Sequence, residues 1–148
     1  MTNTRMTVTG LKDLERRLNA LEKDATKRTT ARNALKAGGQ VLADKAKQLA
    51  PYEDGDLRDS IAVSTKLTKR QRSRHRKRDP VEVFAGAGGG SNAVQQEYGN
   101  LNHAAQPYMR PAFDSQKREA LRVIVSDMDK QIDKAIQRQA KRNAKKGR

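Results

Sequence analysis

The chain has 148 residues, which suits one domain, and it contains no cysteine, which excludes disulfides and thiolate metal sites. Its formal net charge is +15, because 32 Lys and Arg residues stand against 17 Asp and Glu residues, and this excess predicts an anionic partner. Hydrophobic residues make up only 34% and aromatic residues 3%, so the core must be thin, and burial against other subunits would stabilise it.

No apolar run approaches the length that crosses a bilayer, and the polar stretch MTNTRMTVTG does not resemble a secretory signal. We therefore expect no membrane partner, and a protein that stays in the cytoplasm or in a particle assembled there.

Two helices are predicted after a loose leader over residues 1–9. Leucines recur at steps of three and four from position 11 to position 21, which is the helical period. A second helical pattern runs from about Thr30 to Leu49 and ends before Pro51, because the residue before a proline avoids the α region. Gly38 and Gly39 each cost up to about 1 kcal/mol relative to alanine, so this pair indicates a kink or a close helix crossing.

Two strands are predicted around a strongly basic stretch. A turn at Asp54-Gly55 precedes a strand from Ile61 onward, and a second strand begins after Pro80. Between them, TKRQRSRHRKRD (residues 68–79) should form the extended tip of a hairpin. Seven cations in this tip could contact nucleic-acid backbone or an acidic partner: Lys69, Arg70, Arg72, Arg74, Arg76, Lys77 and Arg78. No aromatic residue is interleaved, so base stacking is excluded, and a mobile solvated loop is the alternative.

A long amphipathic helix is predicted near the C-terminal end. A flexible glycine-rich loop (residues 86–92) comes first, and the apolar helical pattern then runs from Ala112 to Ile136. Residues 139–148 should form a basic flexible tail. The predicted fold class is α+β: two helices, a small antiparallel hairpin sheet and a long helix in one domain over residues 10–138.

No motif predicts an enzyme or a cofactor. The glycine-rich loop lacks the lysine of a phosphate-binding loop, and no serine sits in a nucleophile elbow. His75 and His103 stand far apart in sequence and in unlike settings, so no metal site is predicted.

Three segments, taken in order, resemble a known family. They are APYEDGDLRDSI (residues 50–61), QEYGN (residues 96–100) and QPYMRPAF (residues 106–113). Together they resemble the tail-completion or neck proteins of long-tailed bacteriophages, a tail-component family similar to the minor tail protein Z of phage lambda. The matching positions that we take as assembly-interface candidates are Pro51, Gly55, Leu57, Arg58, Glu97, Tyr98, Gly99, Pro107, Tyr108, Arg110 and Pro111. Tyr108 stands where the family usually has phenylalanine, and the basic tip and tail are less typical.

The resemblance implies a non-enzymatic virion protein, assembled in the host cytoplasm, at the neck where tail meets head. It implies a homo-oligomeric ring, a hexamer if it matches the tail tube, around the DNA channel. Its partners would be the tail tube or tail terminator protein and the head connector proteins. A thin core and unpaired strand edges fit such a ring.

Alternatives remain open from the residues themselves. The chain could be a stand-alone protein that binds DNA or RNA backbone without sequence preference, whereas a nuclease would require metal ligands that the sequence does not group. Glu97, Tyr98, Gly99 and the PYMRP segment (residues 107–111) could equally form a rigid turn that packs on the long helix. Arg58 and Arg110 could pair with Glu97 or Asp54.

Overall fold

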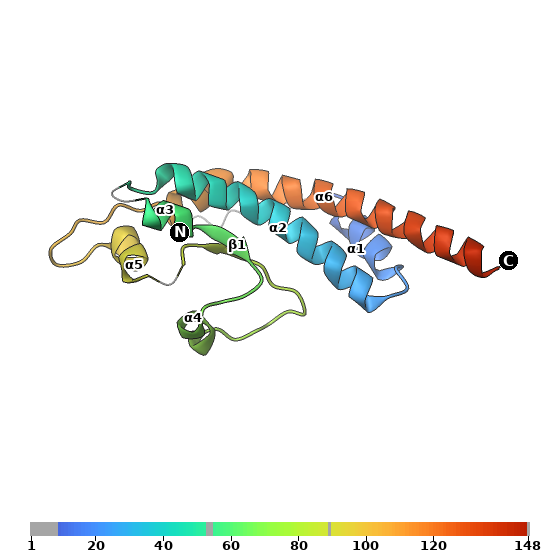
Figure 1. The fold of residues 1–148 in the computed structure, drawn as a ribbon. Helices are drawn as coiled ribbons and strands as arrows, with labels where there is room; N and C mark the ends of the chain where they lie inside the picture. The colour runs from blue at the N-terminus through green and yellow to red at the C-terminus, as the bar shows by residue number, and fades with distance from the viewer. Residues whose placement is uncertain (1–8, 53–54, 89, 148) are drawn as a thin grey trace.

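Two long antiparallel helices form the frame of the molecule (Figure 1). The computed structural model describes residues 9–52, 55–88 and 90–147. Helices α2 (Asp24–Leu49) and α6 (Met109–Lys146) lie side by side, and α1 (Leu11–Asn19) packs against α6 beyond the middle of that helix. Arg17 of α1 forms ion pairs with Asp129 and Asp133 of α6, which ties α1 to the frame.

The two long helices pack through small side chains. Gly38 and Ala34 of α2 and Ala120 of α6 are buried at this contact. A Cβ atom added to Gly38 would lie 2.3 Å from Cγ1 of Ile124 and 2.9 Å from the carbonyl oxygen of Ala120. The glycine therefore permits a close helix crossing, one of the two outcomes that the sequence left open, and α2 continues through the pair as one helix.

The main core cluster sits where α2 ends and α6 begins. Its buried members are Ala43, Ala46, Ala50, Ile61, Tyr108 and Ala112. Four of these six are alanines, so little apolar area is removed from water per residue, and the prediction of a thin core is confirmed.

A two-stranded antiparallel sheet covers one side of α2 (Figure 1). Strands β1 (Ala62–Ser64) and β2 (Phe84–Gly86) pair with Ala62 opposite Gly86. Both are shorter than the sequence predicts. The sheet packs against α2 because Gly39 leaves room there: its added Cβ would lie 3.2 Å from Cγ1 of Val63.

The connection between the two paired strands is a long basic hairpin tip, as the sequence predicts, but part of it is helical. Helix α4 (Lys69–Arg74) forms within it, because Thr68 and Gln71 make a capping box that satisfies backbone N–H groups of the first turn. Glu82 holds the rest of the connection near the sheet by contacts with His75 and Arg78. Its carboxylate lies 2.8 Å from Nε2 of His75 and accepts a 2.9 Å hydrogen bond from the Arg78 N–H.

Helical structure exceeds the prediction at other points. Helix α2 begins at Asp24 rather than near Thr30, α3 (Asp56–Ser60) follows the expected turn at Gly55, and α5 (Ser91–Tyr98) begins inside the predicted glycine-rich loop. Helix α6 continues through Lys146, so residues 139–146 are helical where a flexible tail was expected. Asp54 and residues 1–8 of the predicted leader (residues 1–9) lie outside the described residues. The α+β class is confirmed.

We predict that Gly38→Ala lowers the free energy of unfolding. Alanine gains up to about 1 kcal/mol of helix propensity, but the clash with Ile124 and Ala120 should cost about 1–3 kcal/mol and more than offset it. Gly39→Ala is the comparison, since its nearest contacts would be side-chain atoms of Val63 and Ala85 at 3.2–3.8 Å, with none under 3.0 Å. Chemical denaturation of both variants measures the difference. A Gly38→Ala protein as stable as Gly39→Ala would contradict the close crossing.

Candidate assembly surface

A buried glutamate joins α5 to α6. The Glu97 carboxylate accepts hydrogen bonds from the backbone N–H groups of Tyr108 (2.8 Å), Met109 (2.9 Å) and Arg110 (3.0 Å). These N–H groups open α6 and would otherwise have no partner within that helix. A negative charge at the positive end of the helix dipole adds to the stabilisation. Residues from two of the three family-like segments therefore form one hydrogen-bonded unit.

Arg110 completes this unit and resolves one pairing that the sequence left open. Its Nε donates to Oε1 of Glu97 at 2.9 Å, and its Nη2 donates to the Glu97 carbonyl oxygen at 2.9 Å. The guanidinium carbon lies 4.8 Å from the centre of the Tyr98 ring, which is a cation–π distance. Arg110 thus contacts both the buried carboxylate of Glu97 and the exposed ring of Tyr98.

The protonation of the unit follows from its contacts. Burial opposes the charged form of Glu97, but hydrogen bonds from Tyr108, Met109 and Arg110 outweigh it and keep the pKa of the carboxyl below its usual value. Burial, together with the nearby Glu97 charge, raises the pKa of Tyr108 to about 12. The Tyr108 hydroxyl donates to the Ala93 carbonyl oxygen at 3.1 Å. An ionised, saturated carboxylate of this kind serves as a structural clamp.

Gly99 lets the chain turn tightly after α5. Its φ of 75° lies in the left-handed region, and an added Cβ would stand 2.8 Å from the Ala105 nitrogen. The following loop closes through a bridge between Asn100 and His103 and places Leu101 fully in solvent. Glycine is therefore required here by both backbone conformation and space.

The first family-like segment supports α3. Arg58 donates from Nη2 to the Ala50 carbonyl oxygen at 2.8 Å and lies 5.0 Å from the Tyr52 ring centre, so it pairs with neither Glu97 nor any other carboxylate of the described residues. Gly55, with φ of 84°, precedes α3, and Leu57 packs on the main core cluster. Pro51 follows the last turn of α2.

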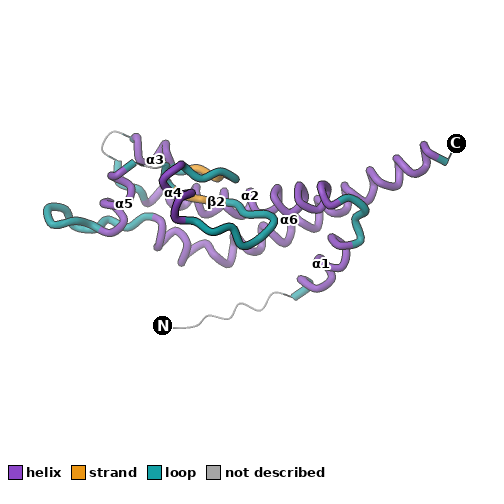
Figure 2. The backbone as a smooth tube through the Cα atoms, turned by 90° about the horizontal axis from the view of Figure 1, so that it is seen from below, coloured by secondary structure: helices purple, strands orange, loops and turns teal. Residues whose placement is uncertain are grey.

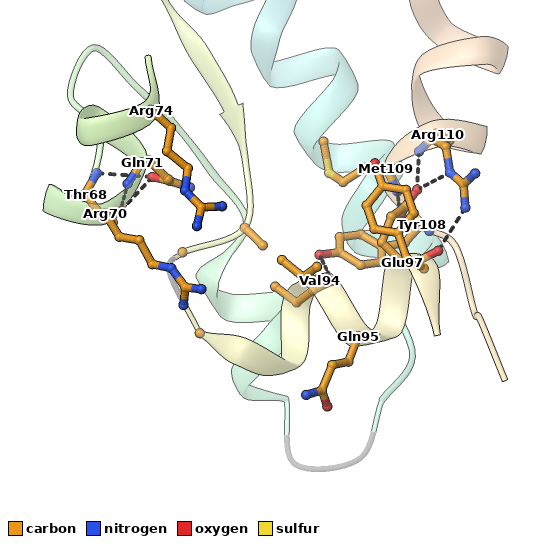
Figure 3. A pocket seen from close by; sticks show the side chains of 15 residues that line it. Thr68, Arg70, Gln71, Arg74, Val94, Gln95, Glu97, Tyr108, Met109 and Arg110 are labelled. Atoms are coloured by element: carbon orange, nitrogen blue, oxygen red, sulfur yellow. Dashed lines mark hydrogen bonds and ion pairs between the residues drawn. The ribbon is translucent and has the colours of Figure 1, made fainter. Parts of the chain in front are cut away.

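A groove of about 570 Å³ lies between the basic helix α4 and the clamp (Figure 3). Arg70 and Arg74 extend from α4 toward it, and Val94 stands on the opposite side. Tyr98 and Met109 contribute further apolar surface, and Arg110 a third cation. The structure thus brings together two sets of residues that the sequence kept apart, the basic stretch and the family-like segments. We call this feature the α4–α5 groove.

The remaining basic residues of the stretch do not line the groove. They are Lys69, Arg72, Arg76, Lys77 and Arg78, and all five are exposed. The Arg72 side chain donates to the Leu67 carbonyl oxygen at 3.2 Å, and the Arg78 backbone N–H donates to Glu82. The prolines differ too. Pro107 precedes the clamp, and Pro111 lies in the first turn of α6, where a missing N–H costs nothing.

Exposed apolar side chains gather on the elements at this end of the molecule. They are Leu49, Tyr52, Val94, Tyr98, Leu101 and Phe113, carried by the end of α2, by α5, by the start of α6 and by adjoining loops. Sequence analysis missed Val94, Leu101 and Glu82. Leu101 had a usable signal, an isolated apolar residue between two asparagines directly after a required glycine.

Among residues 9–52, 55–88 and 90–147, no group of three or more His, Asp or Glu side chains could hold a metal ion. No helix there is long and apolar enough to cross a membrane.

The fold and groove define a small α+β protein with an uncovered apolar end and a basic flank. A family model described as "Bacteriophage HK97-gp10, putative tail-component" matches residues 12–104, which is more than half of the chain. The chain therefore belongs to this family of phage tail components, as the sequence motifs predict, and is a component of the virion. No curated protein and no solved structure matches it. The expected similarity to the lambda protein Z stays a prediction.

We predict that Glu97→Gln destabilises the protein by about 1–3 kcal/mol at pH 7, since the amide replaces a charge that several donors share. The carboxyl has a lowered folded-state pKa, so its stabilisation is present above its unfolded pKa of about 4.3 and is lost as pH falls through the folded value. The deficit of the variant should therefore narrow below about pH 4. Thermal unfolding between pH 3 and 7 measures this.

Glu119→Gln is the matched control, because Glu119 is half-exposed and forms an ion pair with the exposed Arg122 one turn away. An equal loss of stability in both variants would show that Glu97 does not clamp α6.

Proposed function

We propose that this chain is a non-enzymatic structural protein of the phage neck that forms a ring at the head-proximal end of the tail. In that position it completes the tail and joins it to the head around the DNA channel. The membership of the tail-component family carries this proposal.

The packing of the chain supports a ring. A core made largely of alanines leaves the monomer marginal, and large apolar side chains remain exposed at one end. The two-stranded sheet has unpaired edges, which neighbouring copies could cover. Head-to-tail contacts between identical copies close into a ring when the rotation permits it.

The α4–α5 groove is the surface that we assign to a tail or neck partner. Arg70, Arg74 and Arg110 surround apolar surface from Val94 and Tyr98, a combination that fits an acidic protein segment with an apolar side chain. An apolar wall has no counterpart in the phosphate backbone of DNA. The assignment of a protein partner to Arg70 and Arg74 follows from this difference.

A second candidate function is stand-alone binding of DNA or RNA backbone, favoured by the net charge of +15. It predicts tight, salt-sensitive binding by a monomer, whereas the neck role predicts oligomers. Sedimentation or native mass spectrometry of the purified chain separates the two.

We predict that replacing Lys69, Arg70, Arg72 and Arg74 with glutamine leaves the fold intact but impairs head–tail joining. None of the four is buried, so unfolding should be unchanged. Losing more than about 1.4 kcal/mol of docking free energy lowers partner affinity at least about tenfold. The measurement is the infectious yield, together with the fraction of unjoined heads and tails in electron micrographs, from phage complemented by the variant.

The control variant carries the same four-charge loss at exposed positions away from the groove: Lys12, Lys23, Arg28 and Lys36. Wild-type yield from the α4 variant, or equal loss from both variants, would count against a docking role for α4.

A further inference from the structure

The charge of α6 is divided into two parts. From Met109 to Asp133 the helix carries five Lys or Arg residues and five Asp or Glu residues, which balance. From Lys134 to Lys146 it carries six Lys or Arg residues and no acidic residue. The neutral part is the part that packs against α1 and α2, and the cationic part is the part that leaves them (Figures 1 and 2).

The cations of this second part fall on one face because the segment is helical. They follow Lys134 at steps of 4, 7, 8, 11 and 12 residues, which keeps them within an arc of roughly 140° at 3.6 residues per turn. They are Lys134, Arg138, Lys141, Arg142, Lys145 and Lys146, and we call this set the C-terminal basic stripe. A flexible tail, as the sequence predicts, would have no such face.

The stripe points away from the rest of the protein. Gln139 and Asn143, on another side of the same turns, approach Glu22 in the loop between α1 and α2 at 3.4 and 3.5 Å. The last buried side chain of α6 is Ala135, and positions 140–147 are exposed. Within the described chain, no ion pair engages any of the six cations.

Like charges at helical spacing destabilise a helix by a few tenths of a kcal/mol per pair. An anionic partner would remove this repulsion between the cations of the stripe. A protein partner is disfavoured because no exposed side chain larger than alanine and apolar follows Ile136, and interface cores need such side chains. A membrane surface is disfavoured for the same reason, since an interfacial helix needs an apolar face. Nucleic-acid interfaces, in contrast, are polar and strongly positive.

We propose that the C-terminal basic stripe is a second binding site, specific for the phosphate backbone of duplex DNA and blind to its sequence. An α-helix fits the major groove of duplex DNA, and six cations spread over about 18 Å of helix can face phosphates along it. Contacts of this kind position a protein without reading bases. This site is separate from the α4–α5 groove and does not depend on the ring.

The test is binding of the full chain to a fluorescent 20-base-pair duplex of arbitrary sequence, measured by anisotropy between 50 and 300 mM salt. One variant carries Lys141→Gln, Arg142→Gln, Lys145→Gln and Lys146→Gln. The matched control is the α4 variant described above, which loses the same four charges. Circular dichroism and thermal unfolding verify that both remain folded, since none of these side chains is buried.

We expect the stripe variant to bind at least about tenfold more weakly, with the slope of log affinity against log salt reduced by about 3–4. The α4 variant should show a much smaller loss of affinity and a much smaller change in the salt slope. A second duplex of different sequence should give the same values with the native chain. Equal losses in the two variants would reveal an effect of net charge alone and overturn the proposal, as would an unchanged slope in the stripe variant.

Discussion

The hydrogen bonds from the first turn of α6 to the Glu97 carboxylate hold the functional end of the molecule together. The core beside this contact is made mainly of alanines, so packing alone cannot fix the start of a long helix there. The clamp sets where α5 ends, where Gly99 turns the chain and where Arg110 supports Tyr98. The buried Glu97 carboxylate therefore positions the two groove-lining elements other than α4, which are α5 and the start of α6.

A second constraint is the close approach of α2 and α6. Gly38 and the alanines around it allow the two helices to pack closely. Because small residues fill this interface, several large apolar side chains lie on the outer surface instead. Apolar residues are thus distributed toward partners rather than toward the monomer core. For a member of a tail-component family, this distribution is consistent with a chain that reaches its stable form in an assembly.

Much of the fold could be predicted because helical period and proline placement are local signals, as at Leu11–Leu21 and before Pro51. The short helices could not: α4 depends on a capping box between Thr68 and Gln71 inside a stretch dominated by like charges, and the tail of α6 lacks an apolar stripe. The Glu97–Arg110 pair was one of several that the sequence allowed, and only the tertiary contact selects it. The groove was unpredictable, since it joins residues near position 70 to residues near positions 94 and 110.

The three charged features of the chain have different roles in this account: the clamp is internal, the groove meets an acidic partner and the C-terminal stripe meets DNA. We propose that all three belong to a protein that encircles the DNA path at the junction of tail and head. A cryo-electron microscopy reconstruction of the neck in the mature particle tests this claim most directly. The account predicts a closed ring of copies of this chain at the head-proximal end of the tail. Absence of the chain from the mature particle, or its presence only at the distal tip, would contradict it.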